Sequence, residues 1–355
     1  MANYTTIDDP TLYFSTTIYT GDGNQNRAVT IDGTGMQPDW LWVKNRSAAE
    51  GHVVGDSVRG ASQRLIPNST DAEANRPTNI ASFTSTGFTV ANGGVDGAVN
   101  TNSATYVSWG WKAGTSFTND ASSTSVGSID SAGSVSTDAG FSIIRWSGTG
   151  SNATIAHGLG SAPKMMIIKR ITGGTEQWIV YHQAISPAKH LFLNLSDAEN
   201  ADTNNFQNTA TTSSVFSVGT YNQMNASGTN NMIAYCFAEK KGYSKFGSYT
   251  GNGNADGTFV YTGFKPRWIM IKGTNIARNW GINDTKRSPI NQTQDSLYAN
   301  VSDAETGSGN YIDFLSNGFK LRDSALTMNG AYNYIYMAFA ENPFVTSTGV
   351  PACAR

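Results

Sequence analysis

One pattern is written three times along this chain, and it constrains the fold more than any other feature. Each copy has an aromatic residue and a Gly-x-Gly turn, followed by an apolar stretch that starts at a proline and ends on a lysine. The turns are residues 19–23, 146–150 and 249–253, and the apolar stretches are residues 38–44, 163–169 and 266–272. Because such self-similarity marks a repeated structural unit, we expect one unit to occur three times.

The likeness continues after each lysine. A second strand, the tripeptide Asp-Ala-Glu, a strand with a central phenylalanine and an aromatic closing strand follow in the same order. The tripeptides are residues 71–73, 197–199 and 303–305, and the closing strands are residues 106–111, 232–237 and 334–339. Short β-branched or aromatic runs between Gly, Asn and Pro are typical of β-sandwiches and jelly rolls. The sequence therefore predicts an all-β fold of three tandem, jelly-roll-like β-sandwich repeats, each of about 100 residues.

Composition sets the boundaries between these units. The predicted repeats are residues 1–114, 140–242 and 243–344, and residues 345–355 form a C-terminal tail. Residues 115–139 are rich in Ser, Thr and Gly and have little to bury, so they are predicted to be a linker or an arm laid on another surface. Since residue 242 leads directly into 243, repeats two and three are expected to be rigidly coupled, with repeat one sitting apart.

The strands and turns can be placed more finely. Trp40, Leu41 and Trp42 put apolar side chains on both faces of one strand, which predicts a central position in its sheet. The Gly-x-Gly segments are expected to be hairpin turns. A phosphate-binding loop is excluded because the third glycine and the following helix are both missing.

Charge and hydropathy exclude several classes of partner. Charged residues make up 14% of the chain and the formal net charge is −2, so no basic face for nucleic acid is expected. No apolar run approaches the roughly 18 residues that a membrane helix needs, which argues against membrane insertion. No signal peptide is visible at the N-terminus, and we expect synthesis in a cytoplasm.

The candidate chemical groups favour structural roles. Asp-Ala-Glu could supply paired carboxylates for glycoside hydrolysis or ligands for calcium, but a surface turn with Asp capping a short helical turn is favoured. The four histidines are scattered, which favours ordinary polar contacts over a metal site. Cys236 is expected to be a buried free thiol, with a disulfide to Cys353 as the alternative. The sequence therefore predicts no catalytic residue, no metal ligand and no cofactor.

Four aromatic residues are candidate contacts for a glycan or a protein partner. They are Trp178, Tyr181, Trp280 and Tyr298. Exposed aromatic rings on a β-sandwich can stack on sugar rings, because they present a flat apolar face. Trp178 and Trp280 occupy the same position in two repeats, which favours a core role for both.

Three runs of sequence carry a resemblance to a known family. Residues 140–166, 242–251 and 337–344 resemble a repeat unit of tailed-bacteriophage virion proteins, many of them from marine phages. The resemblance covers nearly the whole chain and is strongest from residue 140 to residue 344. Such units are similar in outline to concanavalin-like jelly rolls and occur in tail-fibre, tail-associated and other structural proteins. The family has no established catalytic or ligand residue, so the resemblance assigns none.

The resemblance implies a non-enzymatic virion structural protein that is made in the cytoplasm of a bacterial host. Its expected partners are further copies of itself and other virion proteins, as a tail-associated adaptor, a fibre or a capsid decoration. Because no long coiled or β-helical shaft is present, adaptor or decoration is favoured over fibre. The alternative is a receptor-binding, lectin-like module for host attachment through surface glycan. A glycan-degrading tail enzyme is a third, weaker reading.

Overall fold

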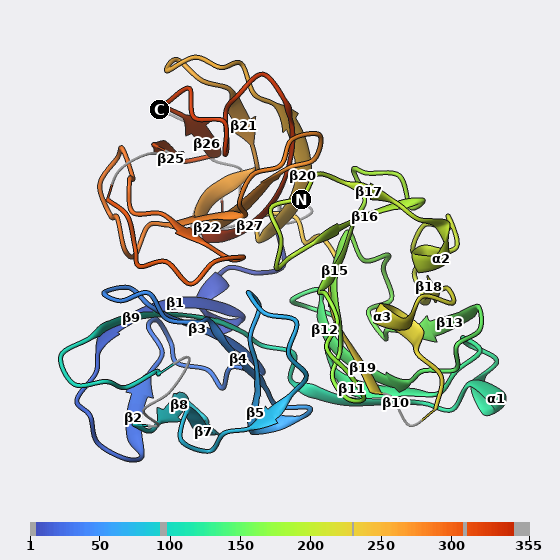
Figure 1. Cartoon of the computed structure of the whole chain (residues 1–355). Coiled ribbons are helices and arrows are strands. Elements are labelled where there is room, and N and C mark those ends of the chain that lie inside the picture. Colours follow the sequence, from blue (N-terminus) through green and yellow to red (C-terminus); the bar gives the residue numbers. More distant parts are fainter. Residues whose placement is uncertain (1–4, 93–97, 229–230, 308–310, 344–355) are drawn as a thin grey trace.

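A computed structural model describes residues 5–92, 98–228, 231–307 and 311–343, and within them the fold is all-β. The chain forms three lobes around a common centre, coloured blue, green and orange in Figure 1. Lobe 1 is residues 5–114, lobe 2 is residues 115–242 and lobe 3 is residues 243–343. Each lobe has one larger and one smaller antiparallel sheet, packed face to face over an apolar core.

Lobe 1 begins with the single-turn helix η1 (Pro10–Leu12). Its larger sheet, in spatial order, is β1 (Phe14–Thr20), β9 (Thr105–Trp111), β3 (Trp40–Asn45), β4 (Val53–Asp56), β5 (Gly60–Leu65) and β6 (Ala74–Asn75). The smaller sheet is β2 (Arg27–Thr30), β8 (Gly87–Val90) and β7 (Ile80–Thr84).

Lobe 2 has the longest sheet of the described residues. In spatial order it contains β10 (Thr115–Asn119), β11 (Ser131–Ser136), β12 (Phe141–Ser147), β19 (Asn231–Phe237), β14 (Met165–Arg170), β15 (Ile179–His182), β16 (Lys189–Phe192) and β17 (Asn200–Ala201). The smaller sheet is β13 (Ala153–Ala156) with β18 (Val215–Val218), and the short helices are α1 (Ala121–Thr124), α2 (Thr203–Phe206) and α3 (Asn222–Asn225).

Lobe 3 repeats the central part of this order. Its larger sheet is β20 (Ser244–Thr250), β27 (Asn333–Pro343), β22 (Phe264–Gly273), β23 (Gly281–Asp284) and β24 (Leu297–Tyr298). Its smaller sheet is β21 (Phe259–Tyr261), β26 (Gly318–Leu321) and β25 (Ile312–Leu315). The last strand of the larger sheet pairs with β1 in lobe 1, with β12 in lobe 2 and with β20 in lobe 3. The Pro-to-Lys strand lies on the other side of that last strand in all three lobes.

The Pro-to-Lys strands β3, β14 and β22 are buried on both faces. In β3, Leu41 and Val43 pack in the core of lobe 1, whereas Trp40 and Trp42 point to the centre of the molecule. The predicted central position of this strand is confirmed, since β3 lies between β9 and β4. The sequence did not reveal that its second apolar face is covered by the other two lobes.

An aromatic core joins the three lobes at the centre of the molecule. Trp40 of lobe 1 stacks on Tyr235 of lobe 2 with 4.6 Å between ring centroids, and Trp111 meets Trp268 of lobe 3 edge-on at 5.6 Å. Phe237 and Phe339 connect lobes 2 and 3. Aromatic pairs of this kind add to the burial of apolar area. The expectation that the first unit sits apart is therefore wrong, because lobe 1 packs against both of its neighbours.

Residues 115–139 form structure rather than a bare linker. They fold into β10, α1 and β11, and this hairpin pairs with β12 to extend the sheet of lobe 2. A Cβ atom on Gly133 would lie 1.7 Å from the carbonyl oxygen of Ile143, so only glycine permits this pairing. In lobes 1 and 3 a side chain from the neighbouring lobe meets the equivalent strand edge. Arg267 donates to Thr16 O at 3.2 Å, and Gln183 donates to Phe246 O at 2.7 Å.

Two further expectations about local structure are wrong. The Gly-x-Gly segments are not hairpin turns, because the strands on either side of each one belong to different sheets of the same lobe. The second glycine has a positive φ in all three loops, at 72°, 70° and 66° for Gly23, Gly150 and Gly253. The Asp-Ala-Glu segments contain no helical turn, and each continues as an extended chain.

Candidate functional site: the junctions between the lobes

A buried lysine forms the first contact of each junction. Its ammonium group donates a hydrogen bond to the backbone carbonyl of the residue before Asp-Ala-Glu in the preceding lobe. The three pairs are Lys169 with Thr70 at 2.8 Å, Lys272 with Ser196 at 3.1 Å, and Lys44 with Ser302 at 3.0 Å. Burial lowers the pKa of each of these lysines to about 8, and nearby carboxylates act in the opposite direction.

The glutamate of each Asp-Ala-Glu segment forms the second contact through its backbone. Its N–H donates to the carbonyl of the residue two places after the lysine. The pairs are Glu73 with Ile171 at 3.0 Å, Glu199 with Thr274 at 2.7 Å, and Glu305 with Arg46 at 2.9 Å. The tripeptide that the sequence singled out is therefore a docking segment between lobes.

A ring nitrogen forms the third contact. Trp178 Nε1 donates to Ile66 O at 3.1 Å and Trp280 Nε1 donates to Phe192 O at 2.9 Å. At the third junction His52 replaces tryptophan, and its Nε2 lies 3.0 Å from Tyr298 O. The Nδ1 atom of His52 accepts from Trp42 Nε1 at 2.8 Å, so the ring hydrogen lies on Nε2 and is donated to that carbonyl. Burial lowers the pKa of His52 to about 3, which keeps the ring neutral.

These contacts place the four aromatic candidates. Trp178 and Trp280 are buried at junctions, and Tyr181 is buried in the core of lobe 2 against Phe206. None of the three is available as a platform for a sugar ring. Tyr298 is half-buried, and its carbonyl accepts from His52. The contacts of the two tryptophans are made within the chain, with the preceding lobe.

All three junctions run in the same direction. Lobe 1 docks on lobe 2, lobe 2 on lobe 3, and lobe 3 on lobe 1, so the three lobes close into a ring. Head-to-tail contacts of this kind close when the rotation between units adds up to a full turn.

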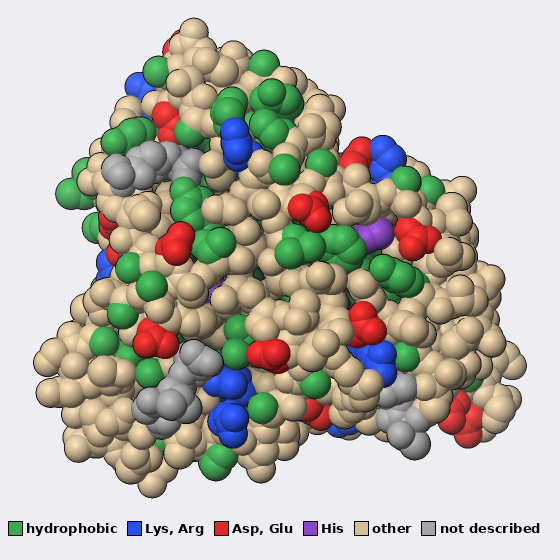
Figure 2. All heavy atoms as spheres, in the orientation of Figure 1, with side chains coloured by type: hydrophobic (Ala, Val, Ile, Leu, Met, Phe, Trp, Pro, Cys, Tyr) green, Lys and Arg blue, Asp and Glu red, His purple; other side chains and the backbone are tan. Residues whose placement is uncertain are grey.

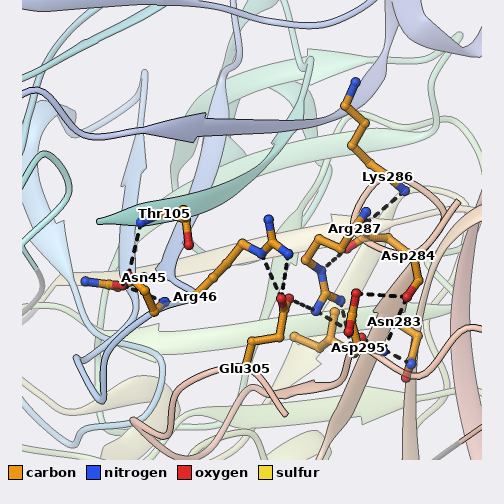
Figure 3. Close-up of polar contacts among 12 residues, drawn as sticks. Asn45, Arg46, Thr105, Asn283, Asp284, Lys286, Arg287, Asp295 and Glu305 are labelled. Atoms are coloured by element: carbon orange, nitrogen blue, oxygen red, sulfur yellow. Dashed lines mark hydrogen bonds and ion pairs between the residues drawn. The ribbon is translucent and has the colours of Figure 1, made fainter. Parts of the chain in front are cut away.

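The junction from lobe 3 to lobe 1 carries additional charged contacts, which Figure 3 shows. Glu305 lies between two arginines from different lobes. Its Oε1 accepts from Arg46 at 2.6 Å, and its Oε2 accepts from Arg287 at 2.8 Å. Arg287 also donates to Asp284 at 2.6 Å, and Asp284 accepts from the indole of Trp109 at 3.2 Å. We call this group of residues the clasp.

The charges within the clasp compensate one another. Arg287 and Asp284 have fully buried side chains. Burial lowers the pKa of Arg287, but Asp284 and Glu305 more than offset this effect and raise the pKa above its usual value. Removing one member would leave a buried charge without its partner, which is far more costly than losing an exposed ion pair.

The lobe 1 to lobe 2 junction has a related but smaller group. Asp56 accepts from Arg59 at 2.6 Å and from the hydroxyl of Tyr235 at 2.7 Å. Glu73 lies 3.5 Å from Arg59 and takes the place of Glu305. The position of Arg46 is occupied by Ile171 in lobe 2 and by Thr274 in lobe 3. Neither can bridge to a carboxylate, so the second arginine belongs to the lobe 3 to lobe 1 junction.

The remaining candidate groups are structural. Within residues 5–92, 98–228, 231–307 and 311–343, no cluster of three or more His, Cys, Asp or Glu side chains could hold a metal ion. All four histidines are buried and make polar contacts, and burial lowers the pKa of His157, His182 and His190 to about 4. Cys236 is a buried free thiol, as expected, and Cys353 lies outside the described residues.

Sequence reasoning missed one buried asparagine in each lobe. Its side-chain oxygen accepts a hydrogen bond from the backbone N–H of the middle residue of the Gly-x-Gly loop. Its side-chain NH2 group donates to the backbone carbonyl of the residue two places after that middle residue. These residues are Asn100, Asn225 and Asn329. The signal was present, because each asparagine lies shortly before the aromatic closing strand of its repeat.

A cleft of about 690 Å³ lies between lobe 1 and the β10–β11 hairpin, and a smaller one of about 520 Å³ lies between lobes 2 and 3. The larger cleft is lined by loop residues of lobe 1 and by β10, β11 and β12 of lobe 2. Arg145, on the strand β12 that pairs with the hairpin, is among the lining residues.

The fold and its junctions define a class: an all-β protein whose three lobes are closed into a ring within one chain. The chain belongs to the family described as a domain of unknown function, DUF7483, which matches residues 9–343. This match spans all three lobes. No match was found among curated proteins. Among the described residues, no helix is long and apolar enough to cross a bilayer.

Proposed function

We propose that the chain is an internal trimer of one jelly-roll-like β-sandwich repeat, and that it serves as a non-enzymatic structural protein of a bacteriophage virion. The observation that carries this proposal is the closed ring. Equivalent lysine, glutamate and ring-nitrogen contacts at three junctions are what three copies of one docking unit would make. A closed ring held by buried contacts suits a component that works through assembly, as a tail-associated adaptor, fibre or capsid decoration.

The outer surface of the ring is left for partners. Lobe 3 carries several exposed large apolar side chains, namely Phe259, Tyr261, Ile290 and Leu326. Phe259 and Tyr261 point outward from β21 on either side of the buried Val260. Figure 2 shows charged side chains scattered over one face of the molecule, without a large patch of either sign. Apolar contacts with other virion proteins, or with further copies of the chain, fit this surface better than nucleic acid does.

The test of this proposal is mass spectrometry of purified particles of the phage that encodes the chain. We expect the protein in the particles at a fixed copy number, after synthesis in the cytoplasm of the host. Phe259→Ser and Tyr261→Ser should lower its incorporation, whereas Ser116→Ala on lobe 2 should not. Particles that lack the protein altogether would refute the virion role.

A second candidate function is favoured by the larger cleft. A receptor-binding module recognises surface glycan through a concave, polar site, and the cleft between lobes 1 and 2 has that form. The two candidates are compatible, because a structural component of a virion can also attach to its host.

A further inference from the structure

The larger cleft exists because one lobe differs from the other two. The β10–β11 hairpin forms one wall, and the loops of lobe 1 that contain Gln37 and Ser57 form the other. Its volume of about 690 Å³ is in the range of small-molecule sites, roughly 300–1,000 Å³. The β10–β11 hairpin is present in lobe 2 and has no counterpart among the described strands of lobes 1 and 3, so the cleft lies where the three lobes differ.

Arg145 projects into this cleft from β12. It pairs with Ile233 on the neighbouring strand β19, and the corresponding strand pairs place Ile18 of lobe 1 and Ser248 of lobe 3 at the equivalent position. Neither of these residues is charged, so the fold does not need an arginine here. Within the described residues Arg145 forms no ion pair, and its side chain is only half-buried.

The two carboxylates in the walls of the cleft are already engaged. Asp39 accepts from the backbone N–H groups of Ala113 and Gly114 at 2.9 and 2.8 Å. Asp130 accepts from the N–H of Ala121 at 2.9 Å. The guanidinium of Arg145 is therefore the charged group in the cleft that is left for a ligand.

Hydroxyl and amide groups make up much of the remaining lining. They include Gln37, Ser57, Ser116, Thr118, Ser134 and Asn231. Each offers both a donor and an acceptor, which suits a ligand with many hydroxyl groups. Apolar side chains in the lining include Val58, Phe117 and Trp146.

We propose that this cleft binds an acidic saccharide. The guanidinium of Arg145 takes the carboxylate of one sugar residue through two parallel hydrogen bonds, and the surrounding hydroxyls and amides bind the sugar hydroxyls. Nucleic acid fits poorly, because Arg145 is the one Lys or Arg among the residues that line the cleft, and a phosphate backbone is bound by several cationic side chains. This inference rests on the second candidate function. The proposed role as a virion structural protein is tested separately, by mass spectrometry of purified particles.

The test uses a tetramer of galacturonic acid as the probe, with isothermal titration calorimetry on the full chain. Maltotetraose, which has no carboxylate, and inorganic phosphate serve as comparison ligands. We expect the acidic tetramer to bind more tightly than either. Arg145→Gln should weaken its binding about tenfold or more, as the loss of a charge-assisted contact implies. Arg76→Gln, an exposed arginine outside the cleft, should leave binding unchanged.

A second pair of variants controls for folding. Ala132 is exposed on β11 directly opposite Arg145. Ala132→Glu places a carboxylate next to the guanidinium and should abolish binding of the acidic tetramer, whereas the equally large Ala132→Gln should retain most of it. Equal thermal unfolding temperatures would show that both variants fold. Binding that is absent, that ignores Arg145, or that is matched by phosphate or maltotetraose would overturn the proposal.

Discussion

The junction from lobe 3 to lobe 1 and the junction from lobe 1 to lobe 2 share one set of docking contacts but differ in connectivity. Lobes 1 and 2 are consecutive in the sequence, with lobe 2 starting at residue 115. Lobes 3 and 1 are not consecutive, so no direct peptide linkage connects them at their junction. Only the unjoined pair has Arg46, which adds a second arginine to the carboxylate of Glu305. Of these two junctions, the one with the additional arginine is therefore the one whose lobes are not consecutive in the chain.

The largest effect is expected when the buried acid of each junction is removed. Asp284→Ala leaves Arg287 without its closest partner and should lower the free energy of unfolding by about 3 kcal/mol or more. Asp56→Ala should have a similar local effect on Arg59. Only Asp284→Ala should let lobe 1 move away from lobe 3, seen as a larger radius of gyration in X-ray scattering. The same expansion in both variants would contradict the assigned role of connectivity.

The bridging glutamates provide a matched comparison. Glu305 contacts arginines on both sides, whereas Glu73 has one arginine at 3.5 Å. Glu305→Gln should therefore cost about 2–3 kcal/mol and Glu73→Gln about 1 kcal/mol, since hydrogen bonds to charged groups contribute more. Urea unfolding of the two variants measures this difference. Equal losses would mean that Arg46 adds nothing to the junction.

The ring nitrogens make the two junctions respond differently to pH. His52 has a pKa near 3 when folded and an ordinary value near 6.5 when unfolded, so the unfolded state binds more protons between these values. Stability is therefore complete above pH 6.5 and falls as pH decreases toward 3. Between pH 7 and pH 5, His52 should account for about 2 kcal/mol of the loss.

His52→Gln isolates this contribution, because the other buried histidines remain. The variant should lose less stability than the parent between pH 7 and pH 5 in urea unfolding experiments. Trp178 occupies the matching position at the lobe 1 to lobe 2 junction and does not titrate, so Trp178→Phe should leave the pH dependence unchanged. Parallel curves for His52→Gln and the parent would rule out His52 as an acid-sensitive contact.

The smallest effect is expected at the rim of the unjoined junction. Lys286 and Asp32 form an ion pair whose side chains are 36% and 33% exposed. Solvent screens such a pair, so Lys286→Ala should cost about 0.5 kcal/mol or less, and less still at high salt. A larger loss of unfolding free energy, or a loss that persists in 1 M salt, would show that this exposed ion pair stabilises the junction as strongly as the buried contacts of the clasp.

The sequence was sufficient to predict the principal strands within a lobe. The Pro-to-Lys strands, the aromatic closing strands and the all-β class follow from local periodicity, which reflects burial on each face of a strand. The alternation of Trp40, Leu41 and Trp42 also showed that both faces of β3 are covered. It could not show what covers them, because period-two patterning is the same whether the second layer is another sheet or another lobe.

Contacts between lobes could not be predicted in the same way. Arg46 and Glu305 are 259 residues apart, and nothing in the local sequence of either indicates the other. Trp178 and Trp280 were correctly favoured as core residues because they share a repeat position, but that core lies between lobes. Residues 115–139 were wrongly predicted to be a linker, because Ser-, Thr- and Gly-rich strands on an exposed sheet edge have the same composition as a linker.

Placing three docking units in one polypeptide changes what a single substitution can do. In a ring of three identical chains, every mutation occurs at all three interfaces, so a feature that suits one site must be tolerated at the other two. Here Ile18, Arg145 and Ser248 occupy one structural position yet can vary independently. Covalent linkage therefore allows one junction to specialise while its two counterparts keep the ring closed.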